Sequence, residues 1–200
     1  MCGYKEIAWQ KCMAITNRKL VAPHAFFTQI ERICQRQPRA LVLREKDLTL
    51  EEYVELAKVA AGICETYQVP FVVHSFYQIL DCPAFADGEI PSNLHMPLAK
   101  VKELSVKERK RWGKIGTSVH SLQELEEAQQ LGVSYVFAGH VFPTDCKKGV
   151  PARGLDFLKE ICAHSKVPVY AIGGVDKSNQ QMCFEQGAAG ICIMSGAMQI

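Results

Sequence analysis

Several features that define membrane, secreted or nucleic-acid-binding proteins are missing from this sequence. No stretch comes close to the roughly 18 consecutive apolar residues that cross a bilayer, and the first residues lack the charged start and long apolar run of a secretion signal. Lys and Arg number 23 against 21 Asp and Glu, so the net charge is only +2, and no block of like charge resembles a nucleic-acid-binding arm. We therefore expect a cytoplasmic protein that binds neither a membrane nor nucleic acid.

The nine cysteines also lack the patterns of disulfide or metal-binding proteins. No two are spaced Cys-x-x-Cys, their number is odd, and most lie in apolar runs such as 190–193, where a thiol behaves as a small hydrophobic group. The six histidines and Cys146 show no metal-ligand spacing, and no cluster of carboxylates accompanies them. The sequence therefore predicts reduced thiols and no metal site.

The sequence does have the composition of an ordinary globular domain. Of the 200 residues, 48% are hydrophobic and 22% are charged, with 14 Gly and 9 Pro. A chain of this length buries roughly 70% of its unfolded surface, so the core needs neither disulfides nor a structural metal. Because no linker or low-complexity stretch interrupts the chain, we predict a single domain over residues 12–200, preceded by an N-terminal extension of residues 1–11.

Short apolar runs alternate with longer amphipathic segments along the chain. Within the runs, apolar and polar residues do not alternate, which is typical of parallel strands covered on both faces. Eight runs are predicted as strands: 12–16, 40–43, 71–73, 93–96, 114–118, 135–138, 168–172 and 190–194. Eight strand-helix repeats favour an α/β fold of the (β/α)8 type, a closed TIM barrel, over an open doubly wound sheet.

Three of the segments between the runs match the capping box, in which Ser or Thr and a Glu three residues later satisfy each other's backbone amides. These boxes begin at Thr49, Ser105 and Ser121, and further helices are predicted near 24–36, 154–164 and 176–187. The connection from Cys82 to Asn93 is short for a full crossover helix, so the third unit departs from the pattern.

Few residues follow the eighth predicted strand. Only Ser195 to Ile200 come after Met194, which is less than two helical turns. The eighth helix is therefore predicted to be missing or vestigial. We expect Trp9 and Ile7 of the N-terminal extension to cover the seam between the eighth and first strands; the alternative cover is a partner subunit, which would make the protein a homodimer.

Two short segments with glycine follow the last two predicted strands. Gly173 and Gly174 come after the seventh strand, and Ser195 and Gly196 come after the eighth. In barrels of parallel strands, the loops after the last two strands commonly hold a phosphate on backbone N–H groups, and glycine lets the backbone approach the anion. We therefore expect these four residues to bind phosphate; the alternative is that the glycines only form turns.

Histidines stand at or near the ends of several predicted strands. His140 follows strand 135–138 and precedes a Val-Phe-Pro segment, so we expect its imidazole to project into the mouth of the barrel. Histidine can take up and return a proton near neutral pH, which makes His140 a candidate acid/base; the alternative is a histidine that stabilises the loop. For His74, His95 and His120, packing or hydrogen bonding is the expected role.

A polar loop over residues 144–154 follows the sixth predicted strand. It carries three cations, Lys147, Lys148 and Arg153, and is flanked by Pro and Gly. Such a loop is either a lid that meets an anionic ligand or a solvated connection, and the sequence leaves both open. Cys146, beside Lys147, is interpreted as a bystander thiol.

Several segments of the sequence together match one known family. Residues 137–149 read FAGHVFPTDCKKG, residues 115–121 read IGTSVHS, residues 171–174 read AIGG, residues 193–196 read IMSG and residues 43–46 read LREK. These motifs closely resemble the thiazole tautomerase (TenI-type) branch of the thiamine-phosphate-synthase superfamily, over about residues 12–196. The Gly-His-Val-Phe segment at 139–142 is the most specific, because it separates the tautomerase branch from the synthases.

The resemblance implies a (β/α)8 barrel and an isomerase of thiamine biosynthesis that needs no cofactor. The implied reaction converts a dihydrothiazole carboxylate phosphate, which has an exocyclic double bond, into the aromatic 2-(2-carboxy-4-methylthiazol-5-yl)ethyl phosphate by a proton shift. The family's catalytic histidine maps onto His140, and its phosphate-binding backbone maps onto Gly173, Gly174, Ser195 and Gly196.

The resemblance also assigns positioning roles around the phosphorylated thiazole. Arg44, Lys46 and Lys147 would hold the two anionic ends of the substrate, and Ser118 would hydrogen-bond its carboxylate.

The sequence departs from the synthases of the superfamily, which carry Asn-Asp after the third strand and an acidic residue after the fourth to hold Mg²⁺ and pyrophosphate. Here the third strand ends in His74 and Ser75, and residues 94–98 contain no acid. Condensation of a thiazole phosphate with a pyrimidine pyrophosphate is therefore disfavoured. Thiamine-phosphate synthase and a non-catalytic regulatory or ligand-binding relative are the two alternatives.

Overall fold

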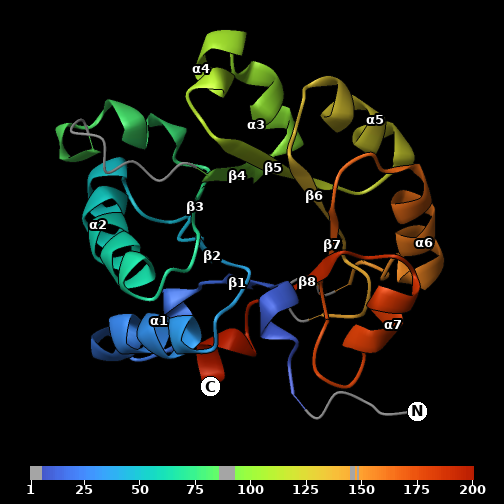
Figure 1. The fold of residues 1–200 in the computed structure, drawn as a ribbon, viewed down its shortest axis with the longest axis horizontal. Helices are drawn as coiled ribbons and strands as arrows, with labels where there is room; N and C mark the ends of the chain where they lie inside the picture. The colour runs from blue at the N-terminus through green and yellow to red at the C-terminus, as the bar shows by residue number, and fades with distance from the viewer. Residues whose placement is uncertain (1–5, 86–92, 145–146, 148) are drawn as a thin grey trace.

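Eight parallel strands form a closed barrel at the centre of the molecule (Figure 1). The computed structural model describes residues 6–85, 93–144, 147 and 149–200. The strands are β1 (Cys12–Ile15), β2 (Ala40–Leu43), β3 (Phe71–His74), β4 (Asn93–Pro97), β5 (Lys114–Val119), β6 (Tyr135–Gly139), β7 (Val169–Ile172) and β8 (Gly190–Ile193). Each strand pairs with the next and β8 pairs with β1, so the sheet has no free edge. The predicted (β/α)8 barrel is confirmed, and the predicted strands differ from the observed ones only at their ends.

Helices surround the barrel in the order expected from right-handed strand-helix units (Figure 1). They are α1 (Phe26–Gln35), α2 (Leu50–Thr66), α3 (Leu98–Glu103), α4 (Val106–Lys110), α5 (Leu122–Gln130), α6 (Gly154–His164) and α7 (Gln180–Glu185). The helices predicted near 24–36 and 154–164 match α1 and α6 closely, whereas α7 is shorter than the predicted 176–187.

Two of the three predicted capping boxes are complete. At Thr49 and at Ser105 the hydroxyl accepts from the amide three residues later, and the Glu at that position accepts from the cap amide. At Ser121 only the first half forms: the hydroxyl accepts from Glu124 N at 3.1 Å, but the Glu124 carboxylate accepts from His120 N at 2.6 Å. The prediction of a complete box at Ser121 is therefore wrong, because the preceding amide competes for the same carboxylate.

The connection between β3 and β4 differs from the other units, as its length suggests. Two short 3₁₀ turns, η4 (Tyr77–Asp81) and η5 (Pro83–Phe85), follow β3, and the described residues 75–85 contain no α-helix. Ile79 and Phe85 are nevertheless buried, so these turns close the wall of the barrel with apolar side chains in place of a helix.

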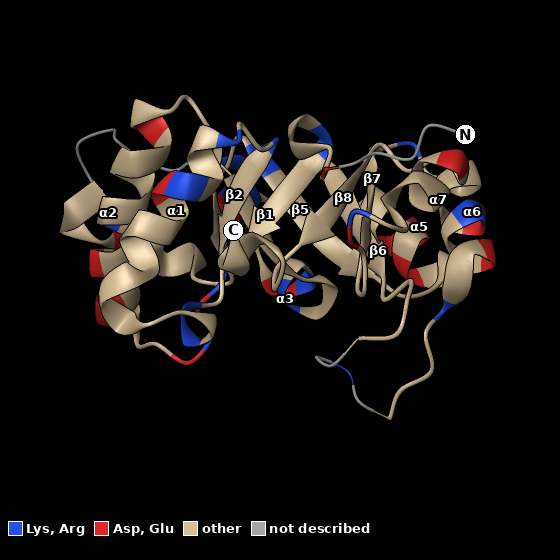
Figure 2. Cartoon of the chain, turned by 90° about the horizontal axis from the view of Figure 1, so that it is seen from below, with Lys and Arg blue, Asp and Glu red and all other residues tan. Residues whose placement is uncertain are grey.

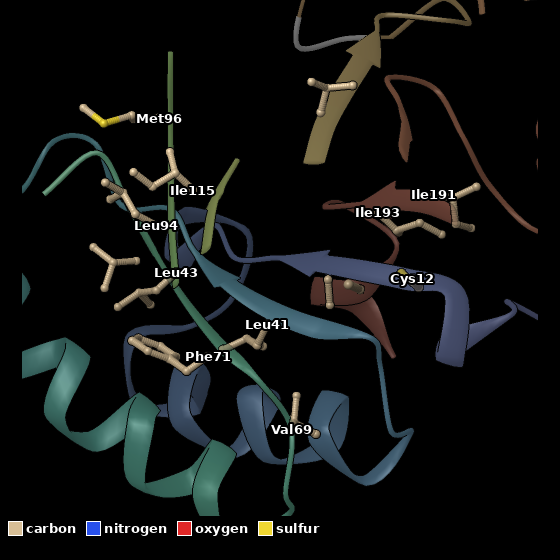
Figure 3. Close-up of a cluster of buried hydrophobic side chains, with 14 of the residues drawn as sticks. Cys12, Leu41, Leu43, Val69, Phe71, Leu94, Met96, Ile115, Ile191 and Ile193 are labelled. Carbon is tan, nitrogen blue, oxygen red and sulfur yellow. The ribbon is translucent and has the colours of Figure 1, made fainter. Parts of the chain in front are cut away.

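The core consists of two apolar layers separated by the strands. Inside the barrel lie Met13, Ile15, Ala40, Val42, Val72, Tyr135, Phe137, Tyr170 and Cys192. Residues at the intervening positions, such as Leu41 and Leu43 on either side of Val42, pack outside the barrel, as Figure 3 shows for β1, β2 and their neighbours. Alternate positions of a strand point to opposite faces, so burial on both faces requires the uninterrupted apolar runs seen in the sequence.

Only a 3₁₀ turn, η7 (Ala197–Gln199), stands where an eighth helix would follow β8. It is fastened to α1, because Gln29 donates from Nε2 to the Ala197 carbonyl at 2.9 Å. The expectation of a vestigial eighth helix agrees with this turn.

The segment 6–11 lies beside α7 and leads into β1, between α7 and the C-terminal turn (Figure 1). Gln180, the first residue of α7, accepts from Ala8 N at 3.0 Å and donates to Glu6 O at 2.7 Å, and the Lys11 ammonium lies 5.0 Å from the centre of the Phe184 ring. Trp9, in the turn η1 (Trp9–Lys11), is only 9% exposed and belongs to the outer apolar layer.

Ile7 also packs against the outer layer, although it remains half-buried. The two side chains proposed from the sequence as seam cover therefore both contact the core in the described part of the extension. Residues 1–5 of the extension lie outside the described residues.

Charged side chains lie mainly on the helices and loops, with both signs interspersed (Figure 2). The strands carry little charge, in keeping with their burial. Of the described helices, none is both long and apolar enough to cross a membrane.

Candidate functional site

The carboxyl ends of the strands form an open end of the barrel, which we call the mouth. Alternate residues of a strand face inward, and Val42 and Val72 belong to the interior layer, so Arg44 and His74, two residues further on, also face inward at the mouth. Sites in (β/α)8 barrels are built at this end, because the loops after the strands meet there.

Three cations predicted as substrate-positioning residues come together at the mouth. Arg44 places its Nη1 atom 3.9 Å from Met194 Sδ, next to β8. Partial burial of the Lys46 ammonium, and then the charges of Arg44 and Lys147, lower the pKa of Lys46. Because each of these groups acts on Lys46, an anion entering here meets a locally positive potential even though the net charge of the protein is small.

His74 and His95 lie side by side on the neighbouring strands β3 and β4, with ring centres 5.6 Å apart. Burial, followed by the charges of Lys46 and Arg44, lowers the pKa of His74 to about 3. Burial, followed by His74 and Lys46, lowers the pKa of His95 well below its usual value. Both imidazoles are therefore neutral near pH 7 and act as uncharged hydrogen-bonding groups.

His95 reaches from β4 to β5 inside the barrel. Its Nε2 atom lies 3.1 Å from Ser118 Oγ, and its ring stacks on Phe137 at 3.9 Å between centres. Gly116 leaves room for the neighbouring Tyr135 ring, because a Cβ atom there would lie 2.1 Å from that ring. The predicted positioning residue Ser118 is thus present at the mouth, with His95 as a partner that the sequence did not suggest.

Tyr53 on α2 fixes the ends of β2 and β3 behind the mouth. Its hydroxyl donates to Leu43 O at 2.7 Å and accepts from His74 N at 3.0 Å, and its ring stacks on Phe76 at 4.1 Å. Leu43 is the residue before Arg44, and His74 is the last residue of β3. The fully buried Tyr53 hydroxyl therefore holds the backbone that positions the side chains of Arg44 and His74 at the mouth.

Glu45 lies between Arg44 and Lys46 in the sequence, but its side chain faces away from the mouth. Its carboxylate is 2% exposed and accepts from the Thr16 hydroxyl at 2.7 Å and from Arg18 N at 3.0 Å. Thr16 Oγ1 in turn accepts from Arg44 N at 3.0 Å, so the group joins the loop after β1 to the end of β2. Asp47 is likewise occupied, with the Arg18 guanidinium binding both of its oxygens.

The donor set at the mouth is therefore cations, neutral imidazoles and hydroxyls. In the portion of the chain that the structure describes, no three His, Cys, Asp or Glu side chains are grouped as metal ligands. A hollow of about 460 Å³ on the surface lies elsewhere, beside α1, and its lining residues Arg32, Gln35, Arg36 and Ile200 include no acid/base pair.

His140, the predicted acid/base, follows β6 but does not project freely into the mouth as expected. It is 4% exposed, and the Val150 carbonyl lies 3.2 Å from its Nε2. A carbonyl only accepts, so Nε2 carries a hydrogen, and Nδ1 is the basic nitrogen of the tautomer that this contact selects. His140 Nδ1 is buried, and no described residue hydrogen-bonds to it.

Gly173 and Gly174, predicted to bind phosphate, pack directly against the residues after β6. Their φ angles are +94° and +66°, and a Cβ on Gly173 would lie 2.2 Å from His140 Cβ. A Cβ on Gly174 would lie 2.4 Å from Pro143 O. The turn and the close packing therefore require glycine at both positions, which agrees with the alternative that the glycines form turns. Their role in phosphate binding stays a prediction.

Ser195 and Gly196 follow β8 at the rim of the mouth and are exposed. Because β7 and β8 are paired, these residues and the Gly173–Gly174 turn end neighbouring strands, as the phosphate prediction requires. Lys147 is exposed in the loop after β6; Cys146 and Lys148 lie outside the described residues.

Comparison with known proteins matches residues 12–197 to the model of one family, described as thiamine monophosphate synthase (TMP-TENI). The chain belongs to this family. It is 31% identical over 188 residues to the thiamine-phosphate synthase of Clostridium acetobutylicum, an alignment that covers 94% of this chain and 87% of that protein. It is likewise 31% identical to the thiamine-phosphate synthase of Pyrococcus furiosus, over 94% of this chain and 86% of that protein.

The same relationship holds in three dimensions. The solved structure of a thiamine phosphate pyrophosphorylase from Pyrococcus furiosus superposes with a TM-score of 0.77 at 28% identity, covering 96% of this chain and 88% of the other. The thiamine monophosphate synthase family consists of enzymes of thiamine biosynthesis, so the expected superfamily is confirmed. The names of these relatives are those of synthases and do not single out the tautomerase branch.

Sequence reasoning did not place His74 and His95 at the inward positions of the mouth. His74 and His95 were expected only to pack or hydrogen-bond, and they do so, but at the inward positions of the mouth. The period of two along β3 and β4 could have indicated this, because each follows an inward residue by two positions. His120, the first residue after β5, binds Glu124 Oε2 through Nδ1 at 3.1 Å.

Proposed function

We propose that this protein is a thiazole tautomerase, which isomerises the dihydrothiazole carboxylate phosphate to 2-(2-carboxy-4-methylthiazol-5-yl)ethyl phosphate with His140 as the acid/base. The observation that carries the proposal is the contact of His140 Nε2 with the Val150 carbonyl. This contact leaves Nδ1 as the free base in the neutral ring, and a proton shift within one molecule needs a single base fixed in one tautomer.

The reaction needs no electron acceptor beyond the substrate itself. His140 removes the proton from C2, the ring carbon that bears the carboxylate, and the C2–H electron pair becomes the C2=N bond. The electron pair of the original ring C=N bond becomes the ring C=C bond, and the pair of the exocyclic C=C bond forms the new C–H bond with the proton returned by the imidazolium. No atom is gained or lost, and the product ring is aromatic.

The positive side of the mouth suits a substrate with two anionic ends. The charges of Arg44 and Lys147 both act on Lys46 there, and the exposed residues Ser195 and Gly196 follow β8. Holding the phosphate and the carboxylate at separate cationic groups would orient the ring relative to His140, a contribution of positioning more than of chemistry.

Thiamine-phosphate synthase is the second candidate, because the relatives carry that name. That reaction releases pyrophosphate, and its divalent ion prefers carboxylate oxygens as ligands. At the described mouth residues, β3 and β4 supply imidazoles, and the carboxylate of Glu45 is already occupied. This donor set fits a divalent ion poorly, so we derive no step through one.

One experiment separates the candidates. The protein is incubated with the dihydrothiazole carboxylate phosphate and EDTA, and the aromatic product is followed by NMR. In parallel, it is incubated with a thiazole phosphate, a pyrimidine pyrophosphate and Mg²⁺, and released pyrophosphate is measured. We expect isomerisation in the first mixture and no release in the second. Release of pyrophosphate without isomerisation would overturn the proposal in favour of the synthase, and activity in neither mixture would favour a non-catalytic ligand-binding relative.

A further inference from the structure

His95 and Ser118 form a hydrogen-bonded pair across β4 and β5 that the proton shift at His140 does not use. In the strand register Gly116 stands opposite His95, so Ser118, two residues further along β5, lies nearer the mouth than His95. Burial agrees with this order, because His95 is 2% exposed whereas Ser118 is half-buried. The serine is the member of the pair that a ligand in the mouth can reach.

The contact between the two residues can be made in two ways. Either His95 Nε2 carries the hydrogen and donates to Ser118 Oγ, or Ser118 donates to an unprotonated Nε2. The two forms differ in what Ser118 presents to a ligand. In the first its own hydrogen is free to donate, and in the second its hydrogen is already committed to the histidine.

The surroundings of the other ring nitrogen favour the first form. His95 Nδ1 is buried, and nothing within the described residues hydrogen-bonds to it. If Ser118 were the donor, Nδ1 would carry a buried hydrogen without an acceptor, a state that native structures rarely tolerate. An unprotonated Nδ1 leaves only a lone pair unmatched.

The low pKa of His95 excludes a third form, in which both ring nitrogens carry a hydrogen. Burial, then His74 and Lys46, keep the imidazole uncharged near pH 7, so the two nitrogens do not both carry hydrogens. Stacking on Phe137 at 3.9 Å between centres fixes the plane of the ring and hence the direction of Nε2. His95 is therefore rigid, neutral and aimed at a single hydroxyl.

We propose that His95 is a positioning residue that donates from Nε2 to Ser118 Oγ and thereby fixes the Ser118 hydroxyl as a hydrogen-bond donor to the carboxylate of the ligand in the mouth. Selectivity for carboxylated thiazole phosphates follows, because the hydroxyl would otherwise rotate freely. The inference rests on the proposed function only for the identity of the ligand.

The first test reads the tautomer of His95 without any ligand. In ¹⁵N-histidine-labelled protein near pH 7, the His95 signals are assigned as those lost in the His95→Gln variant. We expect Nε2 to show the chemical shift of a protonated nitrogen and Nδ1 that of an unprotonated one. The opposite pattern, or a doubly protonated ring, would overturn the proposal.

The second test measures binding by calorimetry with two ligands. One is 2-(2-carboxy-4-methylthiazol-5-yl)ethyl phosphate, and the other is 2-(4-methylthiazol-5-yl)ethyl phosphate, which lacks the carboxylate. A hydrogen bond to a charged group is worth a factor of about 10 in affinity, so His95→Phe and Ser118→Ala should each weaken the carboxylated ligand about 10-fold. Both variants should bind the second ligand as the parent protein does.

Two further variants separate this role from a purely structural one. Gln can donate through its side-chain amide, so His95→Gln should retain the preference for the carboxylated ligand that His95→Phe loses. The double variant His95→Phe/Ser118→Ala should lose no more than either single variant, because both act through one hydrogen bond. Equal weakening of both ligands in His95→Phe, or full additivity, would overturn the proposal. If these patterns hold but the protein does not isomerise the dihydrothiazole, the proposed function fails and this inference stands.

Discussion

The neutral histidines at the mouth predict that the protein loses stability in mild acid. His74 has a pKa of about 3 in the folded protein, lowered by burial and by Lys46 and Arg44, against the ordinary value of 6.5 in the unfolded chain. Between these values the unfolded chain binds a proton that the folded protein does not, so the free energy of unfolding falls as the pH is lowered below 6.5. Each pH unit in this range costs about 1.4 kcal/mol, and pH 5 lies about 1.5 units below 6.5.

His74 alone should therefore lower the free energy of unfolding by about 2 kcal/mol between pH 7 and pH 5. His95 acts in the same direction, because its pKa is also lowered. Urea denaturation at pH 7, 6 and 5 measures the effect in the parent protein and in His74→Gln, which cannot be protonated.

We expect His74→Gln to lose about 2 kcal/mol less than the parent over this pH range, whatever its stability at pH 7. His24→Gln serves as the matched control, because His24 is exposed on η3 (Pro23–Ala25) and should leave the pH dependence unchanged. Equal pH dependence in the parent and in His74→Gln would refute the reasoning that His74 is buried uncharged beside the cations.

Three further substitutions test the packing that supports the site, each by urea denaturation. Tyr53→Phe removes the hydroxyl that bridges Leu43 O and His74 N and should cost about 1–3 kcal/mol; an unchanged midpoint would show that the bridge contributes nothing. Gly173→Ala adds a Cβ 2.2 Å from His140 Cβ at a φ of +94°, so it should cost at least about 1 kcal/mol and also reduce isomerisation, and parent-like activity would contradict the contact. Trp9→Ala should cost about 3 kcal/mol because the indole is 9% exposed; a loss near zero would mean that the N-terminal segment does not cover the core.

Much of the fold could be predicted because burial on both faces of a strand leaves a clear trace. The eight apolar runs correspond to the eight strands, and Thr49 and Ser105 mark helix starts through a side-chain pattern that is local in sequence. Ser121 shows the limit of such patterns, because the carboxylate of Glu124 accepts from the amide of His120 and not from the amide of Ser121. Local chemistry therefore predicts where an element begins better than it predicts which of two nearby donors wins.

The site was predictable only in part, because inward and outward positions are not marked by residue type. Glu45 sits between Arg44 and Lys46 in the sequence, yet its carboxylate faces the loop after β1 and helps to hold it. In the sequence, nothing distinguishes His95 from another histidine in an apolar run. Its contact with Ser118 depends on the register of β4 against β5. The orientation of a side chain at a strand end depends on strand pairing, which a single sequence does not display.

Isomerisation by the His140→Ala variant is the measurement that tests the central claim most directly. The dihydrothiazole carboxylate phosphate is incubated with the parent protein, with His140→Ala and with His164→Ala, and the aromatic product is followed by NMR in the presence of EDTA. His164 is the matched control, because it is exposed at the end of α6, where its Nδ1 atom lies 2.9 Å from Glu160 O. General acid/base catalysis by a positioned side chain contributes a factor of about 10² to 10⁴, so His140→Ala should slow the reaction by about that factor while His164→Ala proceeds at the parent rate. Parent-like isomerisation by His140→Ala would contradict the account.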